Sequence, residues 1–216
     1  MKATDASLRV GSLKGKALDA AMRLVERHGV ERLNLRELAA ALGTGPASLY
    51  YHFKNKDALL AELAAEGFRQ LNRAFLKVQE EPGDRPALYG CCATYLHFMR
   101  ERSALYQLMF DERVLTRQAV ARAAEQEAFQ TFARAPPGRG DGSSDVAFTL
   151  WALGRGTAAL CMAAGEPNEA PARDVAQRVV RGLEVMLGYS VRWHAAKTEP
   201  ALLGTNPTRD PNARPD

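Results

Sequence analysis

Apolar side chains recur at intervals of three and four residues along most of this chain, as they do on one face of an α-helix. After the breaker Glu81-Pro82-Gly83-Asp84, no stretch alternates apolar and polar residues in the way that a strand does. The pattern therefore predicts an all-α protein with about nine helices. Their predicted ranges are 13–28, 35–42, 46–52, 56–78, 86–99, 103–110, 116–133, 145–164 and 173–187.

Two of the predicted helices are short, and the turn Gly43-Thr44-Gly45 separates them. Asn34 is a good cap for the first helix, with Glu37 three residues on, and Pro46 suits the first position of the second helix. Gly43 can adopt the left-handed backbone that such a turn requires. The sequence thus predicts a helix-turn-helix, whose second helix enters the major groove of DNA while the first crosses the backbone.

The second short helix and the segment after it are rich in aromatic and basic residues. Leu38, Leu42 and Leu49 provide the contact between the two helices, which leaves the polar and aromatic side chains for the outside. Those predicted to face outward are Ser48, Tyr50, Tyr51, His52, Lys54 and Lys56. Such side chains suit phosphate and sugar contacts. Taken one by one, residues of this segment also fit structural roles. Phe53 and one of the two tyrosines are predicted to be core residues, and the lysines fit an ordinary solvated face.

The excess positive charge lies entirely in the first sixty residues, which hold ten Lys or Arg against six Asp or Glu, whereas the remainder holds nineteen of each. A local basic surplus suits a phosphate-binding surface, because neutralising phosphates releases condensed counterions. An N-terminal arm with Lys2, Arg9, Lys14 and Lys16 is predicted to reach the adjacent DNA backbone or minor groove, with a disordered tail as the alternative.

Residues 13–63 resemble the tetracycline-repressor (TetR) family, on the basis of Ala20-Ala21, Gly29, Leu35 to Gly43 and above all "SLYYHFKNKDALL", Ser48 to Leu60. Such proteins are typically homodimeric, all-helical repressors in which a C-terminal ligand-binding domain controls two DNA-binding heads. The resemblance implies that Arg36, Pro46, Ala47, Ser48, Tyr50, His52 and Lys56 occupy DNA-contacting positions. Together with the outward-facing residues above, the predicted DNA-binding set is Arg36, Thr44, Pro46, Ala47, Ser48, Tyr50, Tyr51, His52, Lys54 and Lys56.

The turn and the second short helix depart from the family pattern. At Thr44-Gly45 the family usually has a branched apolar residue followed by Ser, so the second helix is expected to lose a side-chain cap and one core contact. No Arg, Asn, Gln or Lys lies between Pro46 and Tyr51, so the usual bidentate readers of guanine and adenine are missing there. Arg36 is the best candidate base reader, with a salt bridge to a nearby acid such as Glu37 as the alternative. We therefore expect much phosphate positioning and shape readout.

The second half of the chain is expected to sense a ligand and to dimerise. "ALYQLMF", Ala104 to Phe110, and "LWALGRGTAALCMAAG", Leu150 to Gly165, resemble the C-terminal domain of one TetR subgroup, which often has His at the position of Arg155. Met and aromatic residues suit an adaptable pocket for a small apolar or amphipathic effector, although each also fits a plain core. The predicted effector-binding set is Tyr95, Phe98, Met99, Tyr106, Met109, Phe110, Phe129, Trp151 and Arg155, with Cys91 beside it.

Two polar residues within these apolar helices, His97 and Arg155, need partners. The candidates are a ligand carboxylate, an internal acid such as Asp145 or Glu184, or the subunit boundary. For that boundary the sequence offers a small-residue flank and the last helix, from which two subunits would build a four-helix interface, although packing within one chain explains the pattern nearly as well. The residues concerned are Gly154, Gly156, Ala158, Ala159, Val175, Val179, Leu183, Met186 and Leu187.

Other functions find little support in the sequence. It has no GxSxG, no HExxH and no Gly-rich phosphate loop, and Cys91, Cys92 and Cys161 lack ligand-like spacing, so we expect neither an enzyme nor a bound metal or cofactor. Residues 146–164 are nearly long enough to span a bilayer, but Arg155 lies in their middle, and no secretory signal is present at the start, so a cytoplasmic protein without membrane contact is expected.

These features favour one domain organisation and one function, with a single alternative function. The expected organisation is a DNA-binding domain over 1–55, a ligand-binding and dimerisation domain over 56–190, and a disordered tail over 191–216. The expected function is a ligand-responsive repressor that binds a palindromic operator in double-stranded DNA as a homodimer. The alternative is a helical small-molecule sensor or interaction protein whose DNA head is weakened and non-specific.

Overall fold

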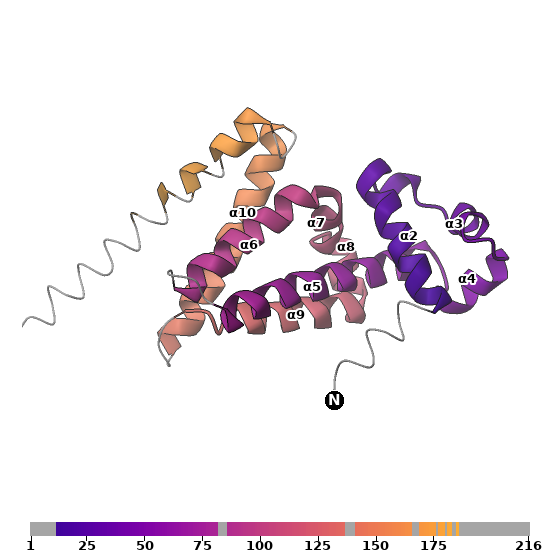
Figure 1. Ribbon diagram of the computed structural model, residues 1–216, viewed down its shortest axis with the longest axis horizontal. Coiled ribbons are helices and arrows are strands. Elements are labelled where there is room, and N and C mark those ends of the chain that lie inside the picture. The colour runs from indigo at the N-terminus through magenta and orange to yellow at the C-terminus, as the bar shows by residue number, and fades with distance from the viewer. Residues whose placement is uncertain are drawn as a thin grey trace, which may run out of the picture.

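The computed structural model describes residues 12–81, 86–136, 141–165, 169–175, 177–179, 181, 182 and 185. Every regular element among them is a helix, which confirms the all-α prediction. A small head lies at one end of the molecule and a larger helical body at the other, and the long helix α5 runs from the first into the second (Figure 1). The head comprises α2 (Leu13–His28), the 3₁₀ turn η1 (Val30–Arg32), α3 (Leu35–Ala41) and α4 (Pro46–His52).

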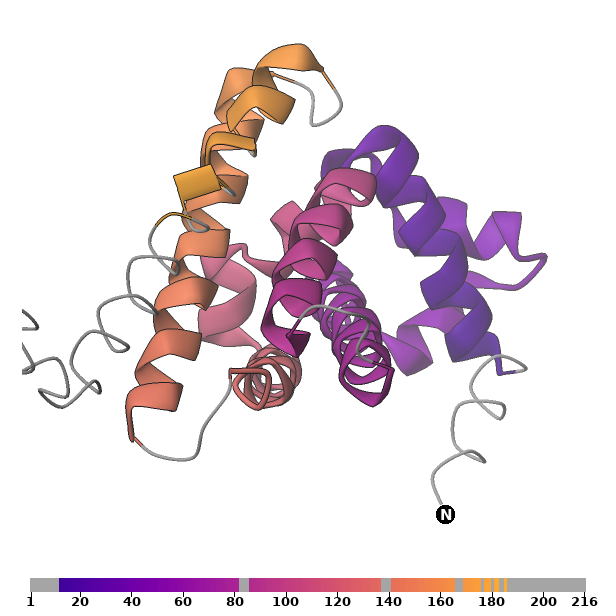
Figure 2. The same cartoon turned by 60° about the vertical axis from the view of Figure 1, so that its left-hand side comes forward.

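The body is built around α5. Its helices are α5 (Lys56–Glu80), α6 (Ala87–Glu101), α7 (Ser103–Met109), α8 (Glu112–Arg117), α9 (Ala119–Phe132) and α10 (Asp141–Ala164). Figure 2 looks almost along α5 and α9, which lie side by side, with α10 at the edge of the molecule furthest from the head. Helical residues between 170 and 182 return along α10, since the Cys161 thiol donates to the Ala172 carbonyl oxygen at 3.4 Å.

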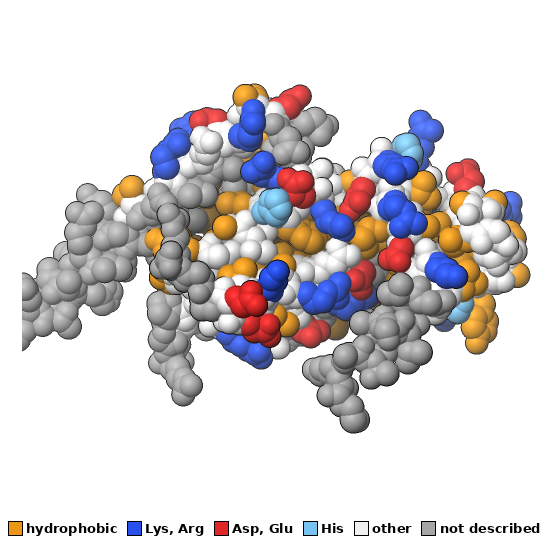
Figure 3. Space-filling model, viewed as in Figure 1, with side chains coloured by type: hydrophobic (Ala, Val, Ile, Leu, Met, Phe, Trp, Pro, Cys, Tyr) orange, Lys and Arg blue, Asp and Glu red, His pale blue; other side chains and the backbone are white. Residues whose placement is uncertain are grey.

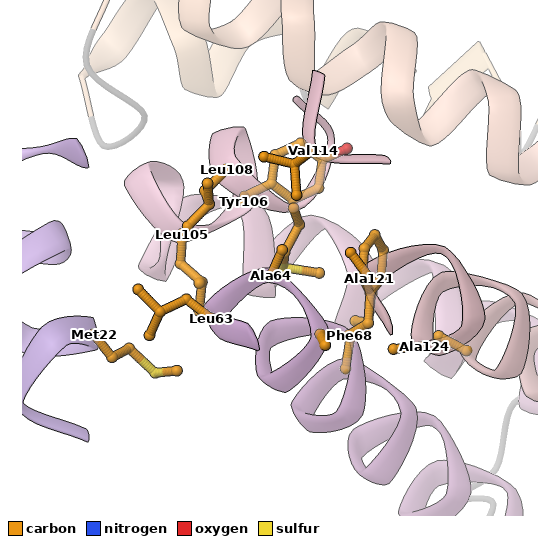
Figure 4. Packing of buried hydrophobic residues seen from close by; sticks show 14 of the residues in the cluster. Met22, Leu63, Ala64, Phe68, Leu105, Tyr106, Leu108, Val114, Ala121 and Ala124 are labelled. Carbon is orange, nitrogen blue, oxygen red and sulfur yellow. The ribbon is translucent and has the colours of Figure 1, made fainter. Parts of the chain in front are cut away.

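The core follows from the apolar faces of α5 and its neighbours. Leu63, Phe68, Leu71 and Phe75 of α5 are fully buried, and a row of buried alanines on α9 at positions 121, 124 and 128 lets the two helices approach closely. Figure 4 shows Ala121 and Ala124 beside Phe68 and Ala64. The small side chains of α9 thus fix α5 as the central helix, with its N-terminal turns completing the core of the head.

Two sequence predictions about helix boundaries differ from the structure. The single helix predicted over 116–133 is two helices, because Asp111 caps an additional one: its side chain accepts a hydrogen bond from Arg113 N at 2.8 Å, and the chain turns extended at Gln118. The helix predicted over 145–164 begins earlier, since α10 starts at Asp141. Of the helix predicted over 173–187, only part lies within the described residues, and the predicted tail lies outside them.

Candidate nucleic-acid interface and effector region

The turn between α3 and α4 is held by backbone hydrogen bonds. Gly43 N donates to the Ala40 oxygen and Thr44 N to the Ala39 oxygen, each at 3.0 Å, while Gly43 adopts the left-handed φ of 66°. Gly45 is the N-cap of α4 and provides no side-chain bond, so the loss of a cap expected from Thr44-Gly45 is confirmed. Backbone geometry and Pro46 therefore define the start of α4.

Replacing Gly43 by alanine is expected to lower the free energy of unfolding by about 1 kcal/mol, because an L side chain resists the left-handed conformation. A Cβ there meets no atom within 4 Å, so the cost is conformational rather than steric. Asparagine tolerates this region better, and Gly43→Asn should cost less than half as much. Urea denaturation measures both, and an unchanged midpoint for Gly43→Ala would contradict the assignment.

The predicted DNA-binding residues lie in α4 and in the segments at its two ends, with Arg36 in the first turn of α3. Thr44, Ser48 and Lys56 are half-buried. The others are exposed: Arg36, Pro46, Ala47, Tyr50, Tyr51, His52 and Lys54. On the face shown in Figure 3, hydrophobic side chains reach the surface at this end of the head, close to basic ones. The helix-turn-helix thus presents a mixed aromatic and basic surface.

The prediction that one of the two tyrosines is a core residue is wrong. Tyr50 is 42% exposed and Tyr51 is 86% exposed, whereas Phe53 is 1% exposed, as predicted. The reason is that α4 has only seven residues, and its inward positions, four residues apart, are taken by Leu49 and Phe53. Both tyrosines consequently face away from the core, with the Tyr51 ring edge-on to His52 at 5.3 Å.

Two of the lysines have partners within the protein. Lys14 belongs to α2 rather than to a free arm, and its Nζ lies 2.6 Å from Glu62 Oε1 and 6.0 Å from the centre of the Phe53 ring. Lys56 Nζ donates to the Glu31 carbonyl oxygen at 3.3 Å and so ties the start of α5 to η1. Lys16 also lies in α2, and Lys2 and Arg9 lie outside the described residues.

The predicted effector-binding residues largely meet in one aromatic cluster in the body. Its centre is Trp151 of α10, whose ring lies 5.3 Å from Tyr95, 6.2 Å from Phe110 and 5.6 Å from Phe129, measured between ring centroids. Sequence reasoning missed other rings of the cluster, among them Phe68 and Phe75 of α5 and Phe132 of α9. The seven-residue spacing of Phe68 and Phe75 on an apolar helix face was the signal that could have found two of them.

The remaining members of the predicted set lie around this cluster. Met99 and Met109 are fully buried, and Phe98 is half-buried against the core. Met109 packs onto Gly67 of α5, where a Cβ atom would come within 2.5 Å of its sulfur. Gly67 therefore lets α7 lie directly on α5.

Two tyrosine hydroxyls form a hydrogen bond inside the cluster, since the Tyr95 and Tyr106 oxygens are 2.7 Å apart. Burial raises the pKa of both groups, to about 12 for Tyr106, and the positive charge of Arg155 opposes that rise at each. Both phenols are accordingly neutral at physiological pH. The pair is a buried polar centre within the aromatic cluster.

Neither His97 nor Arg155 is buried within the chain, since both side chains are exposed. The Arg155 guanidinium lies over the Phe110 ring, 4.8 Å from its centre. Arg155 also acts on the carboxyl group of Glu125 in α9. Burial raises the pKa of Glu125, and the positive charge of Arg155 opposes part of that rise. Asp145, one of the expected partners, is exposed, and the side chain of Glu184 lies outside the described residues.

A narrow pocket opens on the other flank of α10, between α6 and Val179. Of the predicted effector residues, only Tyr95 lines it. The Thr157 hydroxyl donates to the Leu153 oxygen at 2.7 Å, the Tyr95 hydroxyl is hydrogen-bonded to that of Tyr106, and burial keeps the Cys92 thiol neutral by raising its pKa to about 12. The pocket wall is formed by Cys92, Tyr95, Leu96, Phe132, Leu150, Leu153, Gly154, Thr157 and Val179. It is apolar and suits a hydrocarbon group.

The sequence predicted that the small residues of α10 form a single flank of the helix, and this prediction is wrong. Ala158 is buried, and Gly154 packs against the Tyr95 ring of the same chain. Gly156 and Ala159 lie on the exposed face instead. The outer face of α10 thus carries exposed small residues at spacings of four, three and four: Ala152, Gly156, Ala159 and Ala163.

The same helix has the length and apolar composition of a membrane span over Ser143–Ala164, although 28% of that window is buried within the protein. Arg155 lies in the middle of the segment, where a charge is unfavourable in a bilayer. Among the residues that the structure describes, no group of three or more His, Cys, Asp or Glu side chains could hold a metal ion.

Comparisons with known proteins agree with the geometry of the head. The family model described as bacterial regulatory proteins, tetR family, matches residues 17–63. The uncharacterized HTH-type transcriptional regulator YobS of Bacillus subtilis is 30% identical over 102 residues, which are 47% of this chain and 53% of the relative. The nicotine-responsive transcriptional repressor HdnoR of Paenarthrobacter nicotinovorans is 37% identical over 71 residues, 33% of this chain and 37% of the relative.

The fold of most of the chain is also found among solved structures. A protein of unknown function from Rhodococcus sp. RHA1 aligns with 78% of this chain and 91% of its own, at 26% identity and a TM-score of 0.62. The match to curated relatives is shorter, since this chain spans about half or less of their length. The family model covers the head and the first turns of α5, and the similarity of fold extends into the body.

Proposed function

Because the chain belongs to the TetR family of bacterial regulatory proteins, we propose that it is a homodimeric transcriptional repressor that a small effector releases from a palindromic operator. The observation that carries the proposal is the surface of α4, where Tyr50, Tyr51, His52 and Lys54 are exposed beside a turn of helix-turn-helix geometry. Exposed aromatic and basic side chains there suit phosphate and sugar contacts. We also propose that the DNA-binding domain ends at residue 55, that the ligand-binding and dimerisation domain follows it, and that the protein is located in the cytoplasm.

The proposed dimer interface is the outer face of α10. The small residues Ala152, Gly156, Ala159 and Ala163 lie at helical spacing along it, and the exposed large side chains Phe148 and Leu160 lie nearby. Small residues let two helices approach closely, and large apolar side chains in water favour burial. A second copy of this chain is the proposed occupant, since a two-fold dimer places two heads on one palindrome.

The proposed effector site is the aromatic cluster around Trp151, where Tyr95 and Tyr106 supply hydroxyls and Arg155 a positive charge. An apolar or amphipathic molecule fits this chemistry. In the proposed mechanism the effector favours a state in which α5 has pivoted, so that the two heads no longer fit successive major grooves. HdnoR, named as nicotine-responsive, is a precedent for such a response in a relative.

The proposal is tested by selecting binding sites from a randomised duplex library, with the Arg36→Ala variant alongside. Arg36 is exposed and forms none of the ion pairs found among the described residues, so its guanidinium is free to read a base. We expect a palindrome for the unmodified protein. The variant should lose the preference at one base pair per half-site and bind the operator about tenfold more weakly, the scale of one bidentate contact. An unchanged preference would assign base reading elsewhere.

The alternative, a sensor with a non-specific DNA head, draws on two observations. Gly45 leaves α4 without a side-chain cap, and the helix has no bidentate reader between Pro46 and Tyr51. That function predicts no enriched sequence and a binding that falls steeply with salt, because phosphate contacts alone would hold the DNA. The same selection experiment therefore separates the two functions.

A further inference from the structure

Arg102 lies at the junction of α6 and α7, where it ends one helix and begins the other. Its N–H donates to the Phe98 oxygen at 3.0 Å, and its carbonyl oxygen accepts from Tyr106 N at 2.7 Å. The backbone of this residue is thus tied to both helices. Any movement of α7 against the body also moves the start of the Arg102 side chain.

The Arg102 side chain reaches from this junction to the head. Its Nη1 donates to Gln70 Oε1 of α5 at 2.7 Å and to the Met22 sulfur of α2 at 3.4 Å, and it lies 3.2 Å from Glu26 Oε1 of α2. Gln70 Nε2 also donates to the Met22 sulfur, at 3.4 Å. These contacts link the head helix α2 to α5 and to the α6–α7 junction through one guanidinium.

The same three helices, α2, α5 and α7, also share an apolar contact. Met22 of α2, Leu63 of α5 and Leu105 of α7 are buried and point into the same space (Figure 4). On its other side α7 carries Tyr106, which belongs to the aromatic cluster. Helix α7 therefore lies between the head and the proposed effector region, and Arg102 at its start reaches the head.

We propose that Arg102 is a positioning residue for operator binding: it fixes the angle of α2, and so of the whole head, relative to α5 and α7. This inference rests on the proposed function. Two heads must fit major grooves about one helical turn apart, roughly 34–36 Å, so a small rotation of each head weakens operator binding. Non-specific binding uses phosphate contacts that do not depend on this spacing, and it should be insensitive to Arg102.

The test compares Arg102→Met with the unmodified full-length protein. Methionine keeps an apolar stem and removes the guanidinium. At fixed salt, fluorescence anisotropy should show affinity for the selected palindrome falling about tenfold, while affinity for a random duplex of equal length stays within twofold. The matched control is Arg73→Met: Arg73 Nη2 lies 2.9 Å from Glu66 Oε1, but both residues belong to α5. This control should leave both affinities unchanged.

A charge exchange tests the link to Glu26 directly. Arg102→Glu alone should weaken operator binding, and adding Glu26→Arg should restore most of it, because the pair is re-formed with opposite polarity and the Gln70 amide can donate as well as accept. A double variant no better than Arg102→Glu would overturn the inference.

Two further results would also overturn it. One is operator affinity of Arg102→Met equal to that of the unmodified protein. The other is a parallel loss of operator affinity, random-duplex affinity and melting temperature, which would show a general structural role. A failure of the proposed function itself looks different, since the unmodified protein would then select no palindrome, and the inference would fall with it.

Discussion

Replacing Phe53 by alanine is expected to lower the free energy of unfolding of the head by about 3–5 kcal/mol, the usual cost of truncating a buried phenylalanine. Phe53 is 1% exposed and follows the last turn of α4, where it belongs to the same core as Val25, Leu38 and Leu49, each 0% exposed. The Lys14 ammonium lies over its ring, so the substitution also removes a cation–π contact. Urea denaturation followed by circular dichroism measures the loss.

The matched control is Tyr51→Ala, two residues earlier in the chain. Because Tyr51 is 86% exposed, its truncation should change the free energy of unfolding by no more than about 0.5 kcal/mol. Its expected effect is on DNA, where the loss of a sugar or phosphate contact should weaken binding to specific and random duplexes alike. Equal stability losses for the two variants would contradict the assignment of Phe53 to the core and of Tyr51 to the surface.

The elements that the sequence predicts well are those with strong local signals. Asn34 caps α3, accepting from Arg36 N at 2.9 Å, and Asn55 caps α5, accepting from Ala58 N at 2.8 Å. The positive φ of Gly43 likewise agrees with a glycine just after the end of a helix, where the left-handed conformation is common. At these positions a few neighbouring residues determine the backbone, and one sequence suffices to read them.

The predictions that fail concern features decided by tertiary neighbours. No Gly or Pro marks the break at Gln118 between α8 and α9, so the periodicity of the apolar residues ran across it. The orientation of Arg155 was also misread, because its helix is apolar on nearly all sides and the sequence does not say which side faces the core. Ala158 and Ala159 are neighbours of the same residue type, yet Ala158 is buried and Ala159 is exposed, so residue type alone could not predict which of them faces the core.

Placing charges on the outer face of α10 is expected to split the proposed dimer. In the double variant Ala152→Glu, Ala159→Glu, both substituted positions are exposed in the single chain, so the fold should tolerate them. In the dimer each glutamate would be buried against its symmetry mate, where unpaired charges are very unfavourable. Sedimentation equilibrium should therefore find a monomer, with the helical circular dichroism signal of the unmodified protein.

The loss of the dimer should reduce operator affinity at least about 100-fold, since a single head lacks the effective concentration that linkage to a second head provides. The control variant Ala119→Glu, Ala123→Glu places the same two charges on exposed positions of α9 and should remain dimeric. A monomer that kept full operator affinity would contradict the two-headed mode of binding, and a dimer that survived the α10 charges would place the interface on another face.

The proposed dimer interface also explains why α10 has the apolar composition of a membrane span. A helix at a dimer interface is buried on one face by its own chain and on the other by its partner, so it becomes apolar all round. Here 28% of the window over 143–164 is buried within one chain, and the exposed part includes Phe148, 65% exposed, and Leu160, 59% exposed. If the charged variant is a soluble, folded monomer, the apolar outer face of α10 serves association between two copies of the chain rather than insertion into lipid.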